Sequence, residues 1–117
     1  MIEISEPLPE SKQGYNTVHD ILLEGERIGS VSVGYLRKDE IKAFRRTKRR
    51  LRVGQPFGVQ VFIDTSGGKK AESSDRRVLR EIVNALMTKF KGLEERDIYL
   101  LEVSETGKKV IGRATSL

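Results

Sequence analysis

Basic side chains are concentrated in one short stretch of the sequence, KAFRRTKRRLR, which covers residues 42–52. Seven of its eleven residues are lysine or arginine, and none is acidic. Clustered cations attract phosphate backbones by Coulomb interaction and counterion release, and arginine can also donate two parallel hydrogen bonds to phosphate oxygens. The stretch therefore predicts a surface that binds nucleic acid or another polyanion. Its predicted phosphate-binding residues are Lys42, Arg45, Arg46, Lys48, Arg49, Arg50 and Arg52.

The positive charge of the chain is local. Residues 37–52, which we call the basic segment, hold nine basic and two acidic residues, whereas the rest of the chain holds 13 basic and 15 acidic residues. A local basic surface indicates a polyanionic partner more strongly than a diffuse basic composition does. Neither a zinc-finger spacing nor a clear helix-turn-helix is present, so we expect phosphate contacts rather than base reading. Two alternatives remain open: a solvated face without a partner, or charges answered by acidic residues elsewhere in the fold.

A second anion-binding candidate is the glycine-rich stretch TSGGKKAESSDRR, residues 65–77. It lies between a predicted strand and a predicted helix, and free N–H groups at helix N-termini attract anions. Basic residues there oppose the helix dipole, which a bound phosphate would explain. The Walker pattern of phosphate-binding loops is absent, and an ordinary surface loop is the open alternative. The candidate residues are Gly67, Gly68, Lys69, Lys70, Arg76 and Arg77.

Other kinds of chemistry find little support. The chain has no cysteine, which excludes disulfides, thiolate zinc sites and cysteine nucleophiles. His19 is the single histidine, and no nucleophile or metal partner is spaced to it, so we expect a strand-surface histidine without a role and no metal site. The acidic, proline-bearing start is unlike a signal peptide, and no apolar run reaches membrane-spanning length. We therefore expect a cytoplasmic protein that does not bind membranes.

The elements that position these residues follow from hydrophobic periodicity. We expect a short strand at residues 1–6, a hairpin over 17–36, a strand over 57–65, a helix over 75–92 and a hairpin over 97–117. Residues 39–52 are ambiguous: the pattern slightly favours a helix, and a long twisted strand pair stays open. Burying all the apolar stripes together requires one α+β domain over residues 1–117, a mostly antiparallel sheet with one or two helices packed on one face.

Several pieces of the chain resemble the Gcn5-related N-acetyltransferase family. LLEGERIGSVSV is similar to its central hairpin, and VQVFID followed by VLREIVNALM resembles its cofactor-binding strand and helix. The resemblance implies acetyl-CoA as a cofactor, with residues 67–70 at the cofactor loop. It also implies that IYLLEVSETGKKVIGRATSL forms the next strand and the start of a further helix. The family's loop motif is absent from TSGGKKAESSD, and no catalytic residue can be carried over.

The sequence thus predicts a small nucleic-acid-binding protein without a cofactor, and it leaves open whether the chain is an enzyme. One alternative is an acyl-CoA-dependent N-acetyltransferase-like protein. Another is a module whose basic face docks an acidic protein. An exposed edge strand could also pair two copies of the chain. Tyr35, Phe44 or Phe57 could stack on unpaired bases, although core packing is the expected role of each.

Overall fold

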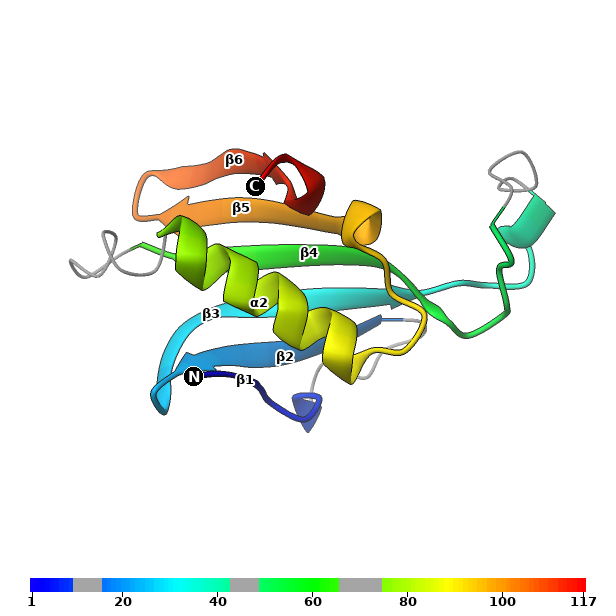
Figure 1. The fold of residues 1–117 in the computed structure, drawn as a ribbon, viewed down its shortest axis with the longest axis horizontal. Helices are drawn as coiled ribbons and strands as arrows, with labels where there is room; N and C mark the ends of the chain where they lie inside the picture. The colour runs from blue at the N-terminus through cyan, green and yellow to red at the C-terminus, as the bar shows by residue number, and fades with distance from the viewer. Residues whose placement is uncertain (10–15, 43–48, 66–74) are drawn as a thin grey trace.

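The structure is a computed structural model, and it describes residues 1–9, 16–42, 49–65 and 75–117 (Figure 1). The described chain forms strands, one α-helix and short 3-10 turns. The strands and the helix are β1 (Ile2–Ile4), β2 (Asn16–Leu23), β3 (Glu26–Tyr35), β4 (Pro56–Asp64), α2 (Arg76–Lys89), β5 (Ile98–Ser104) and β6 (Gly107–Arg113). Two 3-10 turns complete the C-terminal part, η4 (Glu95–Asp97) and η5 (Ala114–Ser116).

The six strands form one sheet in the order β1-β2-β3-β4-β5-β6. Neighbouring strands are antiparallel except β4 and β5, which are parallel because α2 carries the chain back across the sheet between them. The β2–β3 hairpin closes through Glu24 and Gly25, both with positive φ, as a two-residue primed turn requires. The predicted fold class, a single α+β domain with a mostly antiparallel sheet, is confirmed.

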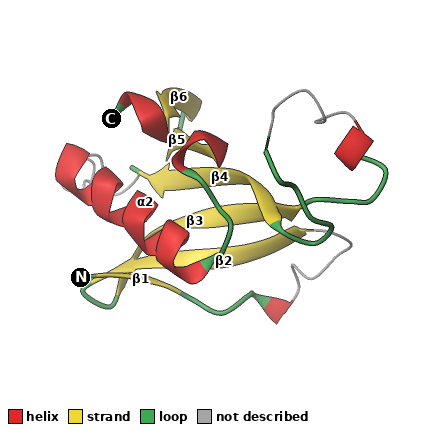
Figure 2. Cartoon of the chain, turned by 45° about the vertical axis from the view of Figure 1, so that its right-hand side comes forward, coloured by secondary structure: helices red, strands yellow, loops and turns green. Residues whose placement is uncertain are grey.

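The core lies between α2 and one face of the sheet (Figures 1 and 2). Val59, Val61 and Ile63 alternate along β4 and are fully or almost fully buried. They pack in one cluster with the apolar stripe of the helix, whose buried members are Leu79, Ile82, Val83 and Leu86. Burial of such side chains stabilises the fold by about 1.5–3 kcal/mol each, before the cost of ordering them.

The opposite face of the sheet is not covered by any described element, and we call it the open face. Cross-strand partners place Ser30, Phe62 and Leu101 in one row on this face, and Ser32, Gln60 and Tyr99 in the next. β3 and β4 also pair closely at Gly29, which is opposite Ile63 and therefore lies on the core face. A Cβ atom on residue 29, in the middle of β3, would lie 2.2 Å from the carbonyl oxygen of Phe62. Glycine at position 29 therefore permits the pairing of β3 with β4.

His19 is buried, so the expectation that it lies on the strand surface is wrong. Its Nδ1 lies 2.8 Å from the carbonyl oxygen of Ser5, and its Nε2 lies 2.9 Å from the hydroxyl of Thr17. The carbonyl can only accept, so Nδ1 donates. The Thr17 hydroxyl also lies 3.0 Å from the Tyr35 hydroxyl, and the rings of His19 and Phe90 pack in a T-shaped pair with their centroids 5.1 Å apart. The histidine thus connects the N-terminal segment, β2, β3 and the end of α2.

The helix favoured for residues 39–52 is not found in the part of that range that the structure describes. A turn at 38–40 leads into a 3-10 turn at 41–42, residues 43–48 lie outside the described residues, and residues 49–52 have irregular backbone. The base of the segment is closed by two backbone bonds of Leu36, which donates to Gln55 and accepts from Gly54. Among the described residues, no helix is long and apolar enough to cross a membrane.

Candidate nucleic-acid interface

The structure describes six of the residues that the sequence predicts to bind anions. Lys42, Arg49, Arg50 and Arg52 belong to the basic segment, and the remaining two, Arg76 and Arg77, begin α2. The other candidates lie outside the described residues, namely Arg45, Arg46, Lys48, Gly67, Gly68, Lys69 and Lys70.

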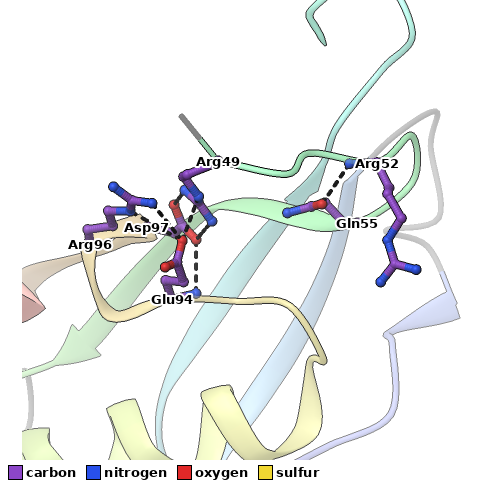
Figure 3. A network of polar contacts seen from close by, with 6 residues as sticks. All are labelled: Arg49, Arg52, Gln55, Glu94, Arg96 and Asp97. Atoms are coloured by element: carbon purple, nitrogen blue, oxygen red, sulfur yellow. Dashed lines mark hydrogen bonds and ion pairs between the residues drawn. The ribbon is translucent and has the colours of Figure 1, made fainter. Parts of the chain in front are cut away.

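Arg49 forms an intramolecular ion-pair cluster with the loop before β5 (Figure 3). Its two terminal nitrogens donate to the two carboxylate oxygens of Asp97 at 2.6 and 2.9 Å, a bidentate pair, and its Nε lies 2.5 Å from Glu94. The guanidinium also lies over the ring of Phe57, 5.3 Å from the centroid. The side chains of Arg49 and Asp97 are only 10% and 5% exposed. We call Arg49, Asp97 and Glu94 the arginine clamp.

The 3-10 turn η4 positions the two acidic residues of the clamp, Glu94 and Asp97. The backbone N–H of Glu94 donates to Asp97 at 2.9 Å, which fixes that carboxylate at the start of η4. The hydrogen bonds from Arg49 to the Asp97 carboxylate raise the pKa of the guanidinium above its ordinary value. The negative charges of Asp97 and Glu94 raise this pKa as well. The positive charge of Arg49 is therefore paired with acidic residues of the same chain. The proposed contact surface does not include Arg49.

The residues that follow Arg49 are oriented differently. Arg50 and Arg52 are exposed, and both line a shallow hollow of about 360 Å³ together with Gln55, Gly92, Arg96 and the clamp residues Arg49 and Glu94. The backbone N–H of Arg52 donates to the side chain of Gln55 at 2.7 Å, and its guanidinium points away from the clamp in Figure 3. The clamp and this turn thus fix the backbone on which the two exposed guanidinium groups are carried.

The described residues of the two predicted anion sites are at opposite ends of the sheet. The basic segment leads into the start of β4, whereas Arg76 and Arg77 follow the end of β4 and begin the helix (Figure 1). The nine residues of β4 span about 30 Å. Moreover, Asp75 caps the helix by accepting from the N–H of Arg77 at 2.7 Å, so part of the N-terminus is already satisfied by the chain itself. The fold therefore does not join Arg76 and Arg77 to the basic segment.

Aromatic rings of the open face were not singled out from the sequence. Tyr35 packs against the core, Phe57 lies under Arg49, and Phe44 is outside the described residues. Instead Phe62 and Tyr99 project from the uncovered side of β4 and β5. The alternation in FGVQVFIDT contained this signal, because a buried Val61 and Ile63 place Phe62 on the other face.

The structure also bears on the implied enzyme. Residues 67–70, at the position of the cofactor loop, lie outside the described residues. After β5 the chain turns into β6 and forms the hairpin that the residue pattern predicts, rather than the helix that the family resemblance implies. Within the described ranges, no three acidic, histidine or cysteine side chains are grouped as metal ligands would be.

Comparison of the chain with models of known protein families finds no match, and comparisons with curated proteins and with solved structures find none either.

Proposed function

We propose that this protein binds nucleic acid through the exposed cations of the basic segment. The observation that carries the proposal is the contrast between Arg49 and its neighbours. One arginine is buried in a bidentate ion pair, while Arg50 and Arg52, on the same short stretch, are exposed beside an open hollow. The clamp lowers the ordering cost of binding, because it fixes the backbone that carries Arg50 and Arg52 before any ligand arrives.

Phosphate contact fits these residues better than chemistry does. Arginine is permanently charged and matches phosphate oxygens with paired donors. The hollow has no buried nucleophile or base among its described lining residues, which are arginines, a glutamine, a glycine and Glu94. We therefore assign it a binding role rather than a catalytic one.

The expected result for the unmodified protein is salt-sensitive binding. Fluorescence anisotropy of labelled single-stranded DNA, single-stranded RNA and duplex DNA should show a log-log salt slope of about −3 to −5, as expected for roughly five phosphate contacts. An uncharged probe of similar size serves as the control. No binding to any of the three nucleic acids at low salt would contradict the proposal, and would turn attention to an acidic protein as the partner.

A further inference from the structure

We infer that the ligand is a single-stranded nucleic acid whose unpaired bases lie on the open face, stacked on Tyr99 and Phe62. This inference rests on the proposed function, and it adds the strandedness of the ligand and the surface that reads its bases. The proposed base-binding surface is the side of the sheet that faces away from α2 and from the core.

Both rings are available to a ligand. Tyr99 is 38% exposed. Phe62 is partly buried, and the ammonium of the exposed Lys108 lies over its ring, 5.0 Å from the centroid, so a base that stacks on Phe62 would take the place of that ammonium. Aromatic rings held on a sheet in this way stack on bases without selecting their sequence, because every base has a π-face.

Each ring lines its own hollow in the open face. One hollow, of about 260 Å³, contains Phe62 and Ser30, and the other, of about 490 Å³, contains Tyr99, Ser32 and Gln60. A base stacked on either ring would therefore have a hydroxyl or amide group beside it for its polar edge. The floor between β3 and β4 is flat where Gly34 pairs with Gly58.

The cations around the open face complement a phosphate backbone. The hollow of Tyr99 is bordered by Asp97, the acidic partner in the arginine clamp, so it adjoins the basic segment. The hollow of Phe62 is bordered at the other end by Arg27, Asp64 and Lys108, and Arg27 is paired with Asp20 at 3.0 Å and with Asp64 at 3.7 Å. A strand that leaves Arg50 and Arg52 would thus cross first Tyr99 and then Phe62, and beyond them the ammonium of Lys108 would be the cation that meets a phosphate.

The spacing of the rings favours a single strand. Tyr99 is opposite Gln60 in the parallel pair of β4 with β5, so Phe62 is its diagonal neighbour. Strand geometry places such neighbours roughly 8 Å apart. Bases within a duplex rise by about 3.4 Å and present only their edges, whereas unpaired bases of an extended strand can separate and stack on protein rings.

The test compares aromatic variants on matched probes. Tyr99→Ala and Phe62→Leu are titrated against one sequence as single-stranded DNA, as single-stranded RNA and as a duplex, over a range of salt. We expect each variant to weaken single-strand binding about tenfold. The salt slope should not change, because no phosphate contact is lost. Tyr99→Phe, which keeps the ring, should bind like the unmodified protein, and the DNA and RNA arms show which source of bases is preferred.

The outcomes separate this inference from the proposed function. If the unmodified protein prefers the duplex, or if Tyr99→Ala and Phe62→Leu bind single strands as tightly as it does, the open face is not the base-binding surface. The proposed function then stands on the salt dependence alone. If the unmodified protein binds none of the probes, both are wrong. Phe62→Leu retains an apolar side chain, and a thermal melt of each variant confirms that it is folded.

Discussion

The double variant Arg50→Glu/Arg52→Glu is expected to bind single-stranded nucleic acid several hundredfold more weakly than the unmodified protein, as an order of magnitude at about 0.1 M salt. Loss of two phosphate contacts alone should cost about 25-fold at that salt, given a slope near −0.7 for each contact on a single strand. Repulsion between the phosphates and two new carboxylates should add a comparable factor. The salt slope should also become shallower, which anisotropy measures directly.

A matched control is available at the far end of the sheet. Arg76→Glu/Arg77→Glu changes the net charge by the same amount on two exposed arginines, about 30 Å away along β4. It places acidic residues in the first turn of α2, where the helix dipole favours them. Equal losses of affinity in the two double variants would mean that overall charge, and not the basic segment, holds the ligand.

The second large effect concerns stability. Arg49→Ala is expected to lower the free energy of unfolding by about 3 kcal/mol, because it leaves the buried carboxylate of Asp97 without its cation. The midpoint of thermal unfolding should fall by roughly 10 °C for a domain of this size. Thermal and urea unfolding followed by circular dichroism provide the measurement, and a double-mutant cycle with Asp97→Ala isolates the energy of the pair.

Arg96 provides the comparison within the same cluster. It lies 3.0 Å from Glu94, but both side chains are about half exposed, so Arg96→Ala should change stability by less than about 1 kcal/mol. If Arg49→Ala were as mild as Arg96→Ala, the clamp would be an ordinary surface ion pair. The backbone of the basic segment would then need another explanation for its position.

Most of the fold was predictable because its elements rest on local patterns. Alternation in β3 and β4 and the stripe of Leu79, Ile82, Val83 and Leu86 each lie within one stretch of chain. The same rule could have found Phe62, as the residue between two buried positions. It could not show that Tyr99 is its diagonal neighbour, because that follows from the pairing of two strands separated by α2.

The candidate site was harder because its decisive contact is distant in sequence. Arg49 and Arg50 are the same residue type in the same basic stretch, and what distinguishes them is the pairing of Arg49 with Asp97, 48 residues further on, and with Glu94. That pairing also explains why residues 49–52, at the end of the range for which the sequence pattern slightly favours a helix, are not helical. Local spacing permitted a helix, but the bidentate pair and the bond from Arg52 to Gln55 hold residues 49–52 in an irregular path.

The two faces of β4 have a consequence for how the sequence can vary. Val59, Val61 and Ile63 lie in the core, while Gln60 and Phe62 lie on the open face. Neighbouring residues of β4 are therefore constrained alternately by core packing and by ligand binding. Substitutions at the odd positions should lower the amount of protein that accumulates in cells. Substitutions at the even positions should spare abundance and alter affinity. In a library of single variants, the positions along β4 should therefore alternate: substitutions at one residue change abundance, and substitutions at the next change nucleic-acid affinity.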